Sequence, residues 1–163
     1  ARVLVLEFGD LECPACAWFH TATLPWVRST FGDTVAFAFR HWPLPYHRFA
    51  MPAARAAECA GEQGKFFEFV DAVYVDQDSL GSVALQQFAV RAGVPDSGAF
   101  AACTARGGAV TSIDEDVREA RALGARGTPA VLVDGYLFAG GPDSAMLHTA
   151  IRTAIGRHYP PGR

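Results

Sequence analysis

The chain has 163 residues, half of them hydrophobic, and carries a formal net charge of −3. This length supports one domain with a substantial core, and the hydrophobic content excludes a disordered chain. The mild acidity gives no indication of nucleic acid or an anionic membrane as a partner, and no apolar run approaches the roughly 20 residues of a membrane span.

The first part of the chain predicts two strands separated by a helix. An apolar run over Arg2–Phe8 is typical of a central, parallel strand, because such strands are buried on both faces. A helical pattern follows over Pro14–Thr30, where Pro25 predicts a kink or a break because proline cannot donate the helical hydrogen bond. Val35–Arg40 predicts the second strand.

The middle of the chain, from about residue 49 to residue 123, shows helical periodicity throughout. Glycines and prolines divide it into segments. The predicted helices are Met51–Ala60, Lys65–Val75, Ser82–Ala92, Ser97–Ala105 and Val110–Leu123.

Strand patterns return near the end of the chain. Ala130–Val133 and Tyr136–Ala139 flank the pair Asp134-Gly135, which is typical of a two-residue hairpin turn. A last helical pattern covers Asp143–Arg157.

This order of elements predicts an α/β protein with a thioredoxin fold and a helical insertion between the second strand and the C-terminal hairpin. We expect residues 1–48 and 124–163 to form the thioredoxin-like domain. Residues 49–123 would then form an inserted helical subdomain.

Two cysteines, Cys13 and Cys16, stand three positions apart where the first strand gives way to the helix. The first turn of a helix brings their sulfurs within bonding reach, and the unpaired N–H groups there stabilise a thiolate on Cys13. Pro14 is tolerated because its missing N–H has no partner to lose at that position. The tetrad Cys13-Pro14-Ala15-Cys16 therefore predicts thiol–disulfide chemistry, with Cys13 exposed and Cys16 shielded.

Two other interpretations of the tetrad are a purely structural disulfide and one half of a zinc site. A zinc site of this kind needs four ligands, typically including a second close pair of cysteines, and the sequence has no such pair. We therefore expect no metal and no prosthetic group, because the two cysteines are themselves the redox centre.

The chain has four cysteines, Cys13, Cys16, Cys59 and Cys103. An even number in one small domain fits two disulfides, which would imply an oxidising compartment. Three pairings are open to four cysteines. The helical geometry of the tetrad favours Cys13 with Cys16, which leaves Cys59 with Cys103.

Several stretches, spread over nearly the whole chain, resemble DsbA-type thiol:disulfide oxidoreductases of bacterial cell envelopes. The stretches are Leu6-Glu7-Phe8-Gly9-Asp10 leading to the tetrad, Phe39-Arg40-His41-Trp42-Pro43-Leu44, Ala53-Ala54-Arg55-Ala56-Ala57-Glu58-Cys59-Ala60, and Gly124-Ala125-Arg126-Gly127-Thr128-Pro129-Ala130. The combination is specific, whereas a lone pair of cysteines at this spacing would not be.

The resemblance implies roles for individual residues. Cys13 would hold the mixed disulfide with the substrate, Cys16 would resolve it, and Glu7 would be the buried acid that exchanges protons on the Cys16 side. Thr128-Pro129 would be the cis-proline loop that faces the active-site disulfide, and its backbone would pair with the substrate polypeptide.

The resemblance also implies that relatives in this branch pair cysteines at the positions of Cys59 and Cys103. We expect a structural bridge, because these positions lack the helix N-terminus of a reactive thiol. The alternative is a redox relay with the first cysteine pair.

The residues around Cys13 predict a moderately acidic thiol. The strongest oxidants of the family resemble this chain but have a histidine where Ala15 stands, and alanine supplies no positive charge. Asp10 and Glu12 would disfavour the Cys13 thiolate by like-charge repulsion. We therefore expect a Cys13 pKa below the free value of about 8.5 but well above the ~3.5 of the most acidic example.

Further candidates lie around the predicted site. Pro14 and Ala15 are expected to contact the substrate. His20, one turn after Cys16, either modulates the cysteines or is an ordinary packed or solvated helix histidine, and we favour the second interpretation. His41 and Trp42 follow the second strand at its active-site end, where they would line a peptide groove or anchor the loop.

These features predict an oxidase that introduces disulfide bonds into unfolded or reduced polypeptides in the periplasm or cell envelope. The family implies re-oxidation by a quinone-linked membrane partner. The chain opens directly in a strand, so we expect a signal or anchor to precede it. We expect a monomer and no nucleic-acid partner.

The alternatives are a disulfide reductase or isomerase on the same scaffold. Thr128 before the proline is also found in isomerase-type relatives, although isomerases are usually dimers and this chain shows no separate dimerisation module. A non-enzymatic alternative is a chaperone or binding module with a structural disulfide, in which Cys13→Ala would leave function intact.

Overall fold

The computed structural model describes residues 3–106, 110–138 and 140–158. Four strands form one mixed sheet in the order β2-β1-β3-β4. They are β1 (Val3–Gly9), β2 (Val35–His41), β3 (Ala130–Val133) and β4 (Tyr136–Leu137). The thioredoxin fold predicted from the sequence is confirmed, and position 2 of the predicted first strand lies outside the described residues.

The central position of β1 is confirmed, but its predicted parallel pairing holds on one side only. β1 is parallel to β2 and antiparallel to β3. The chain enters β3 beside the end of β1, with Ala130 opposite Phe8, so β3 must run back along β1. One face of β1 is fully buried, with Val3, Val5 and Glu7 beneath the helices. On the other face Phe8 is buried but Leu4 is 42 % exposed, so the predicted burial on both faces holds only toward the carboxyl end of the strand.

The hairpin between β3 and β4 is confirmed. Asp134 and Gly135 both adopt positive φ angles, 51° and 85°, which a two-residue turn between antiparallel strands requires. β4 ends at Leu137, and position 139, which the sequence assigned to this strand, lies outside the described residues.

Helices α1 (Pro14–Trp18), α2 (Leu24–Phe31) and α8 (Ser144–His158) cover one face of the sheet. A π-helical turn, Phe19–Thr23, joins α1 to α2, so the predicted helix is continuous but interrupted just before Pro25. The predicted interruption at Pro25 is confirmed, since the wider turn before it leaves the missing N–H of proline without a required partner. Buried residues of this layer are Val3, Val5, Phe19, Val27, Val131, Val133, Leu147 and Ile151.

Helix α7 (Thr111–Ala122) lies on the opposite face of the sheet. Arg40 donates a hydrogen bond of 2.8 Å to Asp116, and the backbone N–H of His41 donates one of 2.9 Å to the same carboxylate. These contacts attach α7 to the end of β2.

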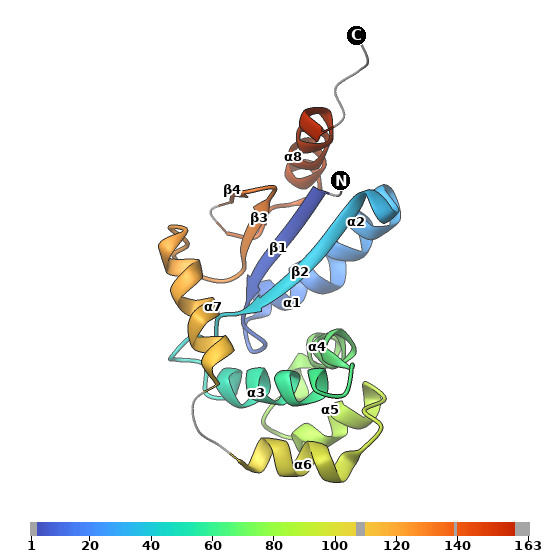
Figure 1. Ribbon diagram of the computed structural model, residues 1–163, viewed down its shortest axis with the longest axis vertical. Coiled ribbons are helices and arrows are strands. Elements are labelled where there is room, and N and C mark those ends of the chain that lie inside the picture. Colours follow the sequence, from blue (N-terminus) through green and yellow to red (C-terminus); the bar gives the residue numbers. More distant parts are fainter. Residues whose placement is uncertain (1–2, 107–109, 139, 159–163) are drawn as a thin grey trace.

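The other four helices lie together beyond the carboxyl end of β1 (Figure 1). They are α3 (Ala50–Gly61), α4 (Phe66–Val75), α5 (Leu85–Arg91) and α6 (Ser97–Ala105), and short 3₁₀ turns occur at Gly32–Thr34 and Gln77–Ser79. Small residues on α3 allow close packing against Phe69, Phe88 and Phe100. In the described ranges no helix is both long and apolar enough to cross a membrane.

Candidate active site

Asp10 shapes the loop that leads from β1 to Cys13. Its buried carboxylate accepts hydrogen bonds from the backbone N–H groups of Glu12 and Leu44, at 2.8 and 2.7 Å, and lies 2.8 Å from Nδ1 of His47. The Glu12 carboxylate accepts a hydrogen bond from the N–H of Phe49. Both carboxylates are therefore held by backbone N–H groups of other residues. The predicted like-charge repulsion is not among the largest causes of the shift in the Cys13 pKa, which is downward.

Two side chains from beyond the sheet hold the same loop. The amide of Gln77 donates to the carbonyl oxygens of Leu11 and Cys13, at 2.9 and 3.1 Å. The hydroxyl of Tyr74 donates to the carbonyl of Asp10 at 3.2 Å. These contacts fix the backbone on which Cys13 stands. No local pattern could predict them, because both donors lie more than 60 positions away.

Cys13 caps the N-terminus of α1, with an extended backbone, and the N–H of Ala17 donates to its carbonyl at 3.1 Å. Hydrogen bonding from the Cys16 thiol lowers the pKa of Cys13 most; burial opposes this, and the Thr128 side chain and the N–H groups of Cys16 and Ala15 assist it. The result is a pKa of about 5, within the range expected from the sequence.

Cys13 is only 7 % exposed, so the prediction of an exposed nucleophile is wrong. The cis-proline loop lies across the thiol, whose Sγ is 3.5 Å from the carbonyl oxygen of Thr128. Pro14 and Ala15 are exposed beside it, and Trp18 projects from α1 with 58 % of its surface open. These three residues form the exposed edge next to Cys13.

Cys16 lies fully buried in the first turn of α1, as predicted. Its sulfur accepts a hydrogen bond of 3.5 Å from the N–H of Asp10. Burial raises the pKa of this thiol strongly, and the thiol of Cys13 and the charge of Glu7 raise it further. Both cysteines are free thiols, so the site is in its dithiol form.

Glu7 is fully buried on β1, and burial raises its pKa although His20 opposes the shift. Its carboxylate lies 3.7 Å from Nδ1 of His20, and Nε2 of His20 contacts Asp71 on α4. His20 is 4 % exposed, so the favoured interpretation of it as an ordinary helix histidine does not account for its two acidic neighbours. Its position four residues after Cys16, on the same helix face, was the available signal.

The Thr128–Pro129 peptide bond is cis, and it lies where the resemblance placed the substrate-facing loop, against Cys13. A groove of about 430 Å³ opens beside this loop. It is lined by Gly124, Ala125, Arg126, Gly127, Thr128, Ala130, Leu137, Phe138 and Gly140.

His41 and Trp42 lie inside the protein, at 1 % and 5 % exposure. Trp42 packs against Phe8 and the small residues of α7 and β3, and Nε2 of His41 lies 3.4 Å from Glu58. Neither side chain can line a surface groove in this arrangement. Burial supports the alternative that they anchor the loop after β2.

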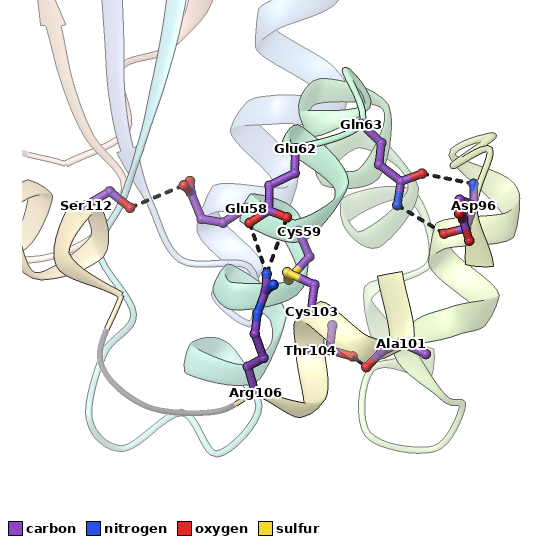
Figure 2. The surroundings of a disulfide bond; sticks show 10 residues. All are labelled: Glu58, Cys59, Glu62, Gln63, Asp96, Ala101, Cys103, Thr104, Arg106 and Ser112. Atoms are coloured by element: carbon purple, nitrogen blue, oxygen red, sulfur yellow. Dashed lines mark hydrogen bonds and ion pairs between the residues drawn. A yellow bond between two sulfur atoms is a disulfide. The ribbon is translucent and has the colours of Figure 1, made fainter. Parts of the chain in front are cut away.

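The bridge between Cys59 and Cys103 is present and joins α3 to α6, with a Cα–Cα distance of 5.8 Å (Figure 2). Polar pairs flank it, including Arg106 with Glu62, which are the residues directly after α6 and α3. The bridge thus lies within a network that ties α6 to α3. No group of three or more His, Cys, Asp or Glu side chains in the described part of the chain could hold a metal ion.

A dithiol at a helix N-terminus, a buried acid behind it and a cis-proline loop in front of it, all on a thioredoxin fold, define a DsbA-like protein disulfide oxidoreductase. The family model Thioredoxin_4, described as thioredoxin, matches residues 1–153, so the chain belongs to this family.

Two solved structures show the same likeness. A thioredoxin-like oxidoreductase from Silicibacter pomeroyi DSS-3 is 26 % identical, with a TM-score of 0.78 over 96 % of this chain and 87 % of that one. DsbA2 from Pseudomonas aeruginosa is also 26 % identical, with a TM-score of 0.68 over 94 % of this chain and 89 % of that one.

A curated relative is the Na⁺/H⁺ antiporter NhaA 1 of Mycolicibacterium vanbaalenii. It is 33 % identical over 153 residues, which cover 93 % of this chain and 25 % of that protein. The chain therefore spans about a quarter of the length of the curated relatives it matches.

Proposed function

We propose that this chain is a dithiol oxidase that transfers a Cys13–Cys16 disulfide to reduced polypeptides in the cell envelope. The observation that carries the proposal is the pKa of Cys13, lowered to about 5 mainly by the Cys16 thiol. A stable thiolate favours the reduced form of the protein, so its disulfide is readily donated.

In this proposal a substrate thiolate attacks the sulfur of Cys13, and Cys16 leaves with the electron pair of the old bond. A second substrate thiolate then attacks the substrate sulfur of the mixed disulfide, and Cys13 leaves as its stabilised thiolate. The substrate gains a disulfide and the two cysteines end reduced, so no further cofactor takes part.

The substrate polypeptide would lie against the cis-proline loop, where an extended segment can pair with the backbone before Pro129. The groove beside Thr128 offers apolar and backbone surface to neighbouring substrate side chains. Exposed Trp18, Pro14 and Ala15 would form the opposite edge. Such contacts suit unfolded chains of varied sequence.

A quinone-linked membrane protein would return the dithiol to the disulfide, and the chain would act as a monomer in the periplasm or envelope. The disulfide between Cys59 and Cys103 supports an oxidising compartment. The curated relatives are named as ion antiporters, and the proposal concerns only the quarter of their length that this chain matches.

The experiment is the reduction potential of Cys13–Cys16 in glutathione buffers, with a Cys59→Ala/Cys103→Ala variant as control. A value toward about −120 mV supports the oxidase, whereas a value near about −270 mV would assign a reductase. Cys13→Ala separates both from the chaperone alternative, since only a chaperone would retain its activity in that variant.

A further inference from the structure

Behind the two cysteines, a line of ionisable side chains leads from the buried dithiol to the protein surface. Glu7 and Cys16 are both completely buried, and His20 follows at 4 % exposure. Asp71, at the far end on α4, has 46 % of its side chain exposed. The proposed oxidase reaction moves a proton on and off Cys16, and this line is a route for it.

Glu7 and His20 face each other without forming the hydrogen bond that a structural ion pair would have. Both carboxylate oxygens of Glu7 and Nδ1 of His20 are buried without a hydrogen-bond partner among the described residues. The two groups nevertheless face each other at 3.7 Å. Leaving such groups unsatisfied costs about 1–3 kcal/mol each, so their placement calls for a role.

The other ring nitrogen of His20 is firmly held. Nε2 forms a short hydrogen bond with Asp71, which fixes the ring and directs Nδ1 at Glu7. Closing the remaining gap by about 0.8 Å would bring Nδ1 and the carboxylate to hydrogen-bond distance. The arrangement therefore allows a proton on Glu7 to pass to His20.

We propose that His20, oriented by Asp71, is a positioning residue that keeps Glu7 able to accept the proton of Cys16. This inference rests on the proposed function, because it concerns the re-oxidation of the dithiol, in which Cys13 forms a mixed disulfide with the oxidant and Cys16 resolves it.

In that step the Cys16 thiol gives its proton to the Glu7 carboxylate, and its sulfur bonds to the sulfur of Cys13. The bond between Cys13 and its disulfide partner breaks, and the partner leaves as a thiolate with the electron pair. The cysteines are oxidised and the partner is reduced. Glu7 becomes a carboxylate again when it passes the proton to Nδ1 of His20, which ends as an imidazolium between two carboxylates.

The groups that face His20 agree with this role. Glu7 faces it from β1, Asp71 and Tyr74 from α4, and Cys16 lies one turn earlier on its own helix. Burial lowers the pKa of His20, but the hydrogen bond with Asp71 and the nearby carboxylate of Glu7 outweigh it, so the net shift is upward. Tyr74 stays neutral, since burial raises its pKa well above the ordinary value.

The test follows the reaction of the reduced protein with excess oxidised glutathione. Mixed-disulfide formation at Cys13 depends on glutathione concentration, whereas resolution by Cys16 does not. Samples are quenched in acid, and mass spectrometry measures the amounts of the mixed disulfide on Cys13 and of the Cys13–Cys16 disulfide. The variants are His20→Gln, Asp71→Asn and Glu7→Gln, and His148→Gln is the matched control because His148 is exposed on α8.

We expect His20→Gln to slow the resolving phase at pH 7 by less than the roughly hundredfold that loss of a general base itself costs, because Glu7 would lose the neighbour that opposes the upward shift of its pKa. The deficit should disappear as the pH rises, and formation of the mixed disulfide should be unchanged. Asp71→Asn, a change at the surface, should produce a smaller deficit of the same pH dependence. In a Glu7→Gln background, adding His20→Gln should change nothing.

The inference is overturned if His20→Gln slows resolution no more than His148→Gln does. It is also overturned if the slowing by His20→Gln is the same at every pH. It is also overturned if the effect of His20→Gln persists undiminished without the Glu7 carboxylate. If the parent protein itself forms no mixed disulfide at Cys13, the proposed function fails, and this outcome is visible in the first phase alone.

Discussion

Replacing Cys16 with alanine removes the hydrogen bond that most lowers the pKa of Cys13. A hydrogen bond to a charged group is worth about 1.5–3 kcal/mol, and one pKa unit corresponds to about 1.36 kcal/mol. The pKa of Cys13, about 5 in the parent, should therefore rise by roughly one to two units in Cys16→Ala. The Cys13 thiol should remain more acidic than a free cysteine, because the backbone N–H groups and Thr128 still lower its pKa.

Thiolate absorbance in the ultraviolet, followed against pH, measures this change directly. The rate of alkylation by iodoacetamide provides a second readout, since only the thiolate reacts. Cys59 and Cys103 do not titrate because they are bridged, so the signal in the variant comes from Cys13 alone. A parent pKa near the free value of about 8.5, or a pKa unchanged by Cys16→Ala, would refute the argument.

The same shift sets the redox behaviour. A pH of 7 lies two units above the Cys13 pKa of about 5, so ionisation of this thiol stabilises the reduced form of the protein by about 2.7 kcal/mol. Because about 30 mV corresponds to 1.4 kcal/mol for this couple, the disulfide should be roughly 60 mV more oxidising than one with an unshifted Cys13.

Three further predictions concern stability, each read from denaturant unfolding. The variant Cys59→Ala/Cys103→Ala should lose up to about 4 kcal/mol, the loop-entropy value for the roughly 45 residues closed, while disulfide exchange at the active site persists. Gly9→Ala should lose about 1–3 kcal/mol, because its Cβ would lie 2.5 Å from an aromatic ring; an unchanged midpoint would contradict this crowding. Hydrogen bonding with His41 lowers the pKa of Glu58. The pair therefore contributes to the free energy of unfolding above pH 4.5, the ordinary pKa of a glutamate, and this contribution is lost as the pH falls through the lowered pKa. The stability difference between the parent and Glu58→Gln should accordingly shrink in acid, and a constant difference would argue against the pair.

Local sequence determined the elements and the position of the chemistry. Pro25 interrupts the first helix, and Asp134-Gly135 closes the hairpin, because each residue restricts its own backbone. Cys13 and Cys16 stand at a strand-to-helix junction for the same kind of reason: four consecutive residues are enough to place two sulfurs on one helical turn. The bounds of less regular segments were harder to predict. Helix α5 begins at Leu85 rather than at the predicted Ser82, because a turn occupies the first residues of the predicted helix.

Only the tertiary structure decided how those residues behave chemically. The sequence placed Asp10 beside Cys13, but its carboxylate accepts a hydrogen bond from the backbone of the loop after β2, and other groups dominate the pKa of Cys13. His20 contacts Asp71, 51 positions away, only because α4 packs behind the active site. Burial of Cys13 likewise depends on the loop at Thr128. Local conformation follows from neighbouring residues, whereas pKa, exposure and ion pairing depend on every group within a few ångströms, and in this fold most of those groups come from distant segments.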